Sequence, residues 1–181
     1  MKHAAPVRRE LGVRTLFNIL GPLTNPAGAA KQVLGVFHPD LVGIQVRVLQ
    51  RLGSTHALTV FGREGLDEIS ISGETLVGEL KDGRVAEYTV HPEQFNLPVH
   101  DPRVLRVGNV EESKAVLLAA LENRSGAARD IVALNAGASI YVSGLAATLA
   151  DGVDKAFETL ASGAARARLD DFVAYTRRVS A

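Results

Sequence analysis

The sequence contains no cysteine and carries no net charge. Without cysteine the chain has no disulfide, no zinc–thiolate site and no cysteine nucleophile. Its 181 residues include 20 Lys and Arg and 20 Asp and Glu, with no block of like charges. A nonspecific nucleic-acid binder or membrane-surface binder needs a basic excess. We therefore expect neither nucleic acid nor membrane as a partner.

Long apolar runs are also missing. No segment approaches the roughly 18 residues of a membrane span, and residues 1–12 lack the apolar core of a secretory signal. Together with the absence of cysteine, which fits a reducing compartment, these features predict a cytoplasmic protein. Hydrophobic residues make up 46% of the chain and charged residues 22%, an ordinary globular mix with enough residues for one sizeable core.

The familiar catalytic patterns are scarce. The chain has neither a G-x-G-x-x-G nor a G-x-x-x-x-G-K-[ST] phosphate loop. Its histidines show no metal-ligand spacing, and the serines near residue 70 have no neighbouring histidine and acid for a hydrolase triad. Any chemistry must therefore rest on other residues.

The pattern that is present predicts an α/β fold. Residues 32–37 and 56–61 are short, apolar runs typical of buried strands, and an apolar stripe over residues 41–52 indicates a helix between them. Two buried strands joined by a helix are typical of a parallel βαβ unit. Residues 75–80 and 84–90 then read as a hairpin, because Asp-Gly is a strong signal for a tight turn.

The second half of the chain is helical in pattern. Asn109 followed by Glu112 resembles a capping box that opens a helix to about residue 122. Apolar periodicity predicts further helices over 127–143, 149–163 and 165–176. No repeat or long linker divides the chain, so we expect a single α/β domain over 1–181, with a largely parallel sheet flanked by helices.

The stretch FGREGLDEIS places two adjacent acids, Asp67 and Glu68, in a short loop after the second strand. Loops at the carboxyl ends of parallel strands bind ligands in open α/β sheets. Two neighbouring carboxylates repel each other, and Mg²⁺ usually takes only one or two protein carboxylates. The residues alone leave two interpretations open: a solvated acidic turn or a magnesium site.

The segment K-H-A-A-P-V-R-R near the N-terminus contains the adjacent arginines Arg8 and Arg9. An arginine fork matches the geometry of a carboxylate or phosphate. Neighbours on a helix diverge by about 100°, so only one of the two can face a given pocket. A solvated surface charge is the alternative for each arginine.

These segments together resemble the anthranilate phosphoribosyltransferases of tryptophan biosynthesis. The resemblance rests on MKHAAPVRRELGVRTLFNILGPLTNPAG, on GLDEIS and on NAGASIYVSG. It implies the large α/β domain of a nucleoside phosphorylase or phosphoribosyltransferase type. It further implies transfer of phosphoribosyl from phosphoribosyl pyrophosphate to anthranilate, with Mg²⁺ as cofactor and a homodimer as the intact state.

The resemblance also implies residue roles. Arg8 corresponds to the family arginine that contacts the anthranilate carboxylate, and Asp67 with Glu68 to the acidic pair that holds magnesium. The family's G-T-G-G-D and K-H-G-N loops and its N-terminal helical domain lie upstream of P-V-R and have no counterpart here. We therefore expect a C-terminal portion of such an enzyme, inactive or nearly so alone. Three alternatives remain: a pyrimidine nucleoside phosphorylase, a nucleic-acid-binding relative without enzymatic activity, and a non-functional truncated product.

Overall fold

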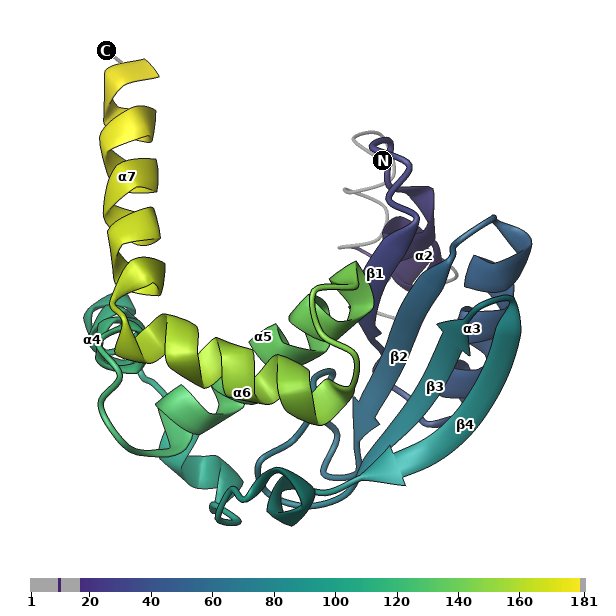
Figure 1. Ribbon diagram of the computed structural model, residues 1–181, viewed down its shortest axis with the longest axis horizontal. Coiled ribbons are helices and arrows are strands. Elements are labelled where there is room, and N and C mark those ends of the chain that lie inside the picture. Colours follow the sequence, from purple (N-terminus) through teal and green to yellow (C-terminus); the bar gives the residue numbers. More distant parts are fainter. Residues whose placement is uncertain (1–9, 11–16, 180–181) are drawn as a thin grey trace.

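The computed structural model describes residue 10 and residues 17–179 of the chain. In chain order, the elements after residue 16 are α2 (Phe17–Leu20), η1 (Gly21–Thr24), β1 (Lys31–Gly35), α3 (Asp40–Arg51), β2 (His56–Gly62), β3 (Thr75–Lys81), β4 (Arg84–Val90), η2 (Pro92–Phe95), η3 (Pro102–Leu105), α4 (Val110–Leu121), α5 (Ala127–Ser143), α6 (Leu149–Ala161) and α7 (Ala164–Val179). Figure 1 shows their arrangement.

The four strands form one sheet in the order β1-β2-β3-β4. β1 and β2 are parallel and joined by α3, so the predicted βαβ unit is confirmed. The other two pairings are antiparallel. The α/β class is therefore confirmed, but the sheet in the described residues is mixed rather than largely parallel. The reason is that no helix separates β2 from β3, and a parallel return needs a crossover connection.

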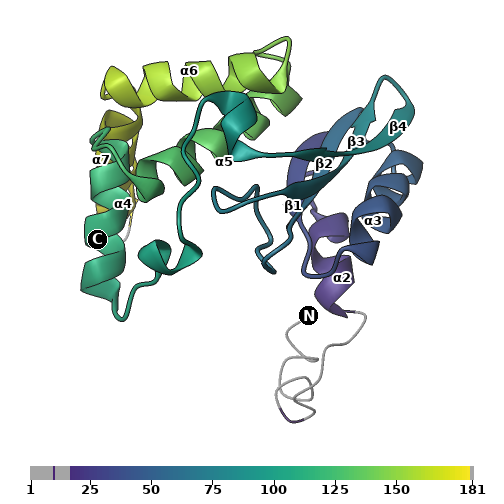
Figure 2. The same ribbon diagram turned by 90° about the horizontal axis from the view of Figure 1, so that it is seen from below.

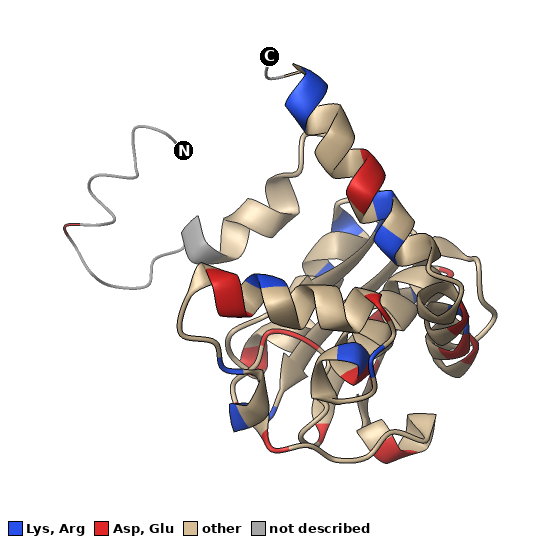
Figure 3. Cartoon of the chain, turned by 90° about the vertical axis from the view of Figure 1, so that its left-hand side faces the viewer, with Lys and Arg blue, Asp and Glu red and all other residues tan. Residues whose placement is uncertain are grey.

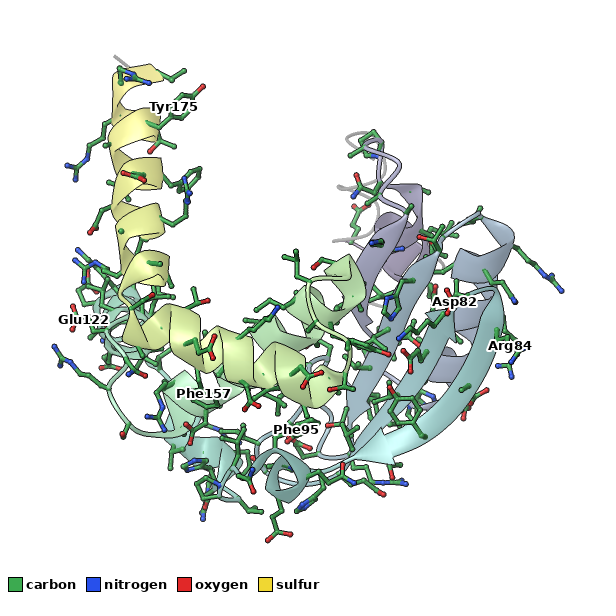
Figure 4. All side chains as sticks on the ribbon, viewed as in Figure 1. Asp82, Arg84, Phe95, Glu122, Phe157 and Tyr175 are labelled. Atoms are coloured by element: carbon green, nitrogen blue, oxygen red, sulfur yellow. The ribbon has the colours of Figure 1, made fainter. Side chains whose placement is uncertain are left out.

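The hairpin between β3 and β4 matches its prediction closely. Lys81 pairs with Arg84, which leaves Asp82 and Gly83 as a two-residue turn. Both turn residues have positive φ, 50° and 74°, as a type I′ turn requires. Figure 4 shows Asp82 and Arg84 at this end of the hairpin. Local turn chemistry alone fixes the register here.

Helices cover both faces of the sheet, with α3 on one side and α5 on the other (Figure 2), and α6 packs on α5. All seven residues of β2 are buried, as expected for a strand covered on both faces. The core on the α3 side contains Leu34, Val36, Val42, Val46, Leu49, Ala57, Phe61 and Leu80. The core on the α5 side includes Leu58, Val60, Val77, Leu134, Ala138, Val142 and Val153.

The C-terminal helices begin at identifiable caps. The Asn109 side chain accepts a hydrogen bond from the Glu112 N–H at 2.8 Å, as the sequence predicts for α4. Thr148 and Asp151 form a reciprocal capping box at α6. Helix α7 extends away from the rest of the fold (Figure 1) and has no buried residue. None of the described helices combines the length and apolar character needed to cross a bilayer.

Candidate functional site

The loop 63–74 connects β2 to β3 at the carboxyl ends of the two parallel strands. It passes directly against the last residue of β1. A Cβ added to Gly35 would lie 1.6 Å from the carbonyl oxygen of Asp67, so only glycine allows this approach. The acidic pair therefore lies at the edge of the sheet where α/β folds bind ligands.

A tight turn opens the loop and brings the chain to Asp67. The Gly62 N–H donates to the Leu66 carbonyl at 2.8 Å, and the Gly65 N–H donates to the Gly62 carbonyl at 2.8 Å. Gly65 has φ of 99°, a conformation that residues with a side chain rarely adopt. Gly62 and Gly65 thus form the tight turn that ends just before the acids.

The far side of the acidic pair is fixed to α5. The Asn135 Oδ1 accepts from the Ile69 N–H at 2.9 Å, and Asn135 Nδ2 donates to the Ile69 carbonyl at 2.9 Å. Ile69 itself is buried in the core. Next to it, the Ser70 N–H donates to Thr75 Oγ1 at 2.9 Å. The loop therefore returns to β3 along an anchored path.

Asp67 and Glu68 are both exposed. Although Glu68 is exposed as a residue, the protein around its carboxyl group excludes part of the solvent. This desolvation first, and the neighbouring charge of Asp67 second, raise the pKa of the Glu68 carboxyl. A bound cation would relieve both effects. Among the residues described, no group of three or more His, Asp or Glu could hold a metal. Two carboxylates fit Mg²⁺, which completes its coordination with water and phosphate oxygens.

The structure does not place every residue that the sequence singles out. Arg8 lies outside the described residues, so its role stays a prediction. Asn135 and Gly35 contact the loop that carries the acidic pair, and the sequence interpretation misses both. A glycine inside the strand run QVLGVF is a known sign of close backbone approach, whereas the partner of Asn135 had no local signal.

A second polar cluster lies at the opposite end of β2, around Glu79. The Tyr141 hydroxyl donates to Glu79 Oε1 at 2.6 Å, and the Tyr88 hydroxyl donates to Glu79 Oε2 at 3.0 Å. His56 Nε2 lies 3.3 Å from Glu79 Oε1, and Lys81 Nζ donates to the Tyr141 hydroxyl at 3.1 Å. The pKa values of Tyr88 and Tyr141 are raised, in both cases mainly by burial. This cluster joins three strands to α5.

Comparison with known proteins places these features in a family. Residues 1–166 match the model described as "Glycosyl transferase family, a/b domain". The chain belongs to this family. It is 64% identical over 179 residues to an anthranilate phosphoribosyltransferase of Methylibium petroleiphilum and 63% identical over 177 residues to that of Leptothrix cholodnii. The matches cover 99% and 98% of this chain, and 52% and 51% of the relatives.

Solved structures of anthranilate phosphoribosyltransferases share the fold. The anthranilate phosphoribosyltransferase of Thermus thermophilus matches with a TM-score of 0.89 at 43% identity, over 98% of this chain and 52% of that one. The Saccharomyces cerevisiae enzyme in complex with PRPP and Mg matches with a TM-score of 0.83 at 26% identity, over 95% and 50%. The resemblance stated from sequence is thus confirmed, and the chain spans about half the length of the curated relatives it matches.

Proposed function

We propose that this chain supplies the cation-holding α/β part of an anthranilate phosphoribosyltransferase of tryptophan biosynthesis. The observation that supports this most directly is the anchored loop that presents Asp67 and Glu68 at the carboxyl edge of the parallel strands. A relative solved with PRPP and Mg shares this fold. In the proposed reaction, the bond from the ribose anomeric carbon to pyrophosphate breaks, the anthranilate amine forms the new C–N bond, and the amine releases a proton to solvent.

The residues of this chain have positioning roles in that reaction. Mg²⁺, when bound, neutralises charge that develops on the leaving pyrophosphate. Asp67 and Glu68 would hold the cation rather than attack the sugar, because the anthranilate amine is the nucleophile in the proposed reaction. Arg8 would pair with the anthranilate carboxylate and direct the amine toward the reacting carbon. We infer no protein base, since an aromatic amine is already a fair nucleophile.

We also propose that residues 1–181 form one partial catalytic domain, act in the cytoplasm, bind neither nucleic acid nor membranes, and in the intact enzyme belong to a homodimer. The positions of basic and acidic residues, coloured blue and red along the cartoon of Figure 3, are interspersed, and the chain's formal net charge is zero. This mixture supports the absence of a nucleic-acid partner, which would require a basic patch. No observation in the described residues favours a nucleoside phosphorylase.

A chimera tests the proposal. The part of the Methylibium petroleiphilum relative that this chain does not match is fused to residues 1–181, and turnover of anthranilate with PRPP and Mg²⁺ is followed. We expect activity that falls by at least about 100-fold in Asp67→Asn with Glu68→Gln, since an electrostatic contact to developing charge has this weight. Asp171→Asn is the matched control, because Asp171 also belongs to a pair of consecutive acids, Asp170 and Asp171 in α7. A folded chimera without turnover, beside an active relative, would overturn the proposal.

A further inference from the structure

The side chain of Asn135 makes two hydrogen bonds to one residue of the loop that carries the acidic pair. Its Oδ1 accepts from the Ile69 N–H and its Nδ2 donates to the Ile69 carbonyl, both at 2.9 Å. The same Nδ2 also donates to the Ile131 carbonyl at 3.1 Å, one turn earlier on α5. A neutral amide offers the donors and the acceptor that this arrangement needs.

The bonds to Asn135 complete a clamp around the acids. On one side, the Leu66 carbonyl is held by the N–H of Gly62, the last residue of β2. On the other side, Ile69 follows Glu68 directly. The two carboxylate-bearing residues are therefore the only residues between a fixed Leu66 and a fixed Ile69.

The helix that carries Asn135 is a rigid support. Helix α5 contributes Leu134 and Ala138, both fully buried, to the core beneath the sheet. Asn135 is 66 residues away from Ile69 in sequence, so its bonds connect the loop to a distant element. A loop attached to such a helix keeps its backbone in place while the neighbouring carboxylates of Asp67 and Glu68 repel each other.

We propose that Asn135 is a positioning residue for the divalent cation held by Asp67 and Glu68. This inference rests on the proposed function, because it assumes that the acidic pair is a cation site. Asn135 would not touch the cation. It would fix the backbone from which Glu68 projects, as residues beyond the direct ligands orient metal-binding side chains in other proteins.

The test measures binding of Mn²⁺ alone to the full chain, by the electron paramagnetic resonance signal of the free ion. Asn135→Ala is expected to weaken Mn²⁺ binding about 10-fold, as loss of a partner beyond the direct ligands typically does. Hydrogen exchange of the Ile69 amide is expected to become faster in the same variant. Ser139→Ala is the matched control, since Ser139 lies one turn further along α5 and its hydroxyl donates to the Asn135 carbonyl within the same helix.

The outcomes separate this inference from the proposed function. Unchanged Mn²⁺ affinity in a folded Asn135→Ala, with affinity lost in Asp67→Asn, overturns the positioning role and leaves the cation site intact. Unchanged affinity in Asp67→Asn removes the cation site, and with it both proposals. If Asn135→Ala does not fold, Asn135→Leu keeps the branching at Cγ but removes the polar atoms, and it is tested by the same two measurements. An Ile69 amide that is unprotected in the unmodified chain overturns the inference without any substitution.

Discussion

At the end of β1, a single hydrogen atom in place of a side chain decides where the acidic loop can lie. Gly35 faces the backbone of Asp67 rather than the tip of a flexible side chain. A backbone segment that is hydrogen-bonded on both flanks has little freedom to move aside. The position of the candidate cation site therefore depends on a residue that would not itself touch the cation.

Gly35→Ala is expected to destabilise the chain by about 1–3 kcal/mol or more, the usual cost of forcing extra atoms into a packed region. It should also weaken Mn²⁺ binding, because the loop must shift. Urea denaturation and Mn²⁺ titration measure the two effects. Gly73→Ala is the control within the same loop, since a Cβ there meets nothing within 4 Å. Equal stability and affinity for the two variants would contradict the assigned contact.

The Tyr88 hydroxyl, which donates a hydrogen bond to Glu79, is expected to make the folded chain less stable as pH rises in the alkaline range. Burial first and the charge of Glu79 second raise the pKa of Tyr88 above its ordinary value of 10.0. Above that value the unfolded chain loses the tyrosine proton while the folded chain keeps it. The folded state is then disfavoured as pH rises, by up to about 1.4 kcal/mol per pH unit for one group.

In Tyr88→Phe, the free energy of unfolding is therefore expected to fall less steeply between about pH 10 and pH 11. The substitution removes a proton that the folded chain keeps and the unfolded chain loses. At pH 7 the same variant should be less stable by about 1 kcal/mol, the usual value of a lost hydrogen bond. Urea denaturation across this pH series gives both results. Tyr175→Phe, on the exposed α7, is the control (Figure 4). An unchanged alkaline slope in Tyr88→Phe would argue against the cluster.

At the scale of elements, α5 and α6 pack backbone against backbone. A Cβ on Gly152 would lie 2.3 Å from the Gly137 carbonyl oxygen, and a Cβ on Gly137 would lie 2.6 Å from Val153 Cα. The two glycines let the helices approach at the point where α6 covers the core. Any side chain there would separate the helices.

Two Gly→Ala substitutions in helices should consequently have opposite effects. Gly152→Ala is expected to destabilise by about 1–3 kcal/mol through overpacking. Gly43→Ala in α3 should be neutral or stabilise by up to about 1 kcal/mol, because alanine is the better helix former. The three atoms nearest to a Cβ at residue 43 belong to the movable ends of the Arg47 and Glu87 side chains. Thermal unfolding of both variants checks the signs, and a stable Gly152→Ala would refute the close helix contact.

The elements also show which parts of the fold could be predicted from sequence. The Asp82-Gly83 turn and the Asn109 cap were predictable, because each depends on residues within four positions. The strands and helices followed from apolar periodicity. The antiparallel return of β3 and the bond from Asn135 to Ile69 depend on contacts between distant segments, which no local pattern reports. The acidic pair was visible in sequence, but its anchoring on β1 and α5 was not.

For the whole molecule, the described sheet ends at β1 on one side and at β4 on the other. β4 carries two exposed charged residues, Arg84 and Glu87, and such charges disfavour pairing with the edge of another sheet. β1 carries a single charged residue, Lys31, so its edge is less protected. Helix α7 adds an apolar surface, since Phe172, Tyr175 and Val179 are 62%, 56% and 65% exposed. Figure 4 shows Tyr175 on this protruding helix.

We therefore expect residues 1–181 alone to associate as concentration rises, because unpaired strand edges and exposed apolar surface both favour contact between chains. Light scattering coupled to size exclusion, over a wide concentration range, measures the effect. Phe172→Ser with Val179→Ser should reduce association if α7 is the contact, and Arg177→Ser, on the same helix, is the control. If the double variant associates as strongly as the unmodified chain, the edge of β1 becomes the contact surface. A monomer at every concentration would contradict both surfaces.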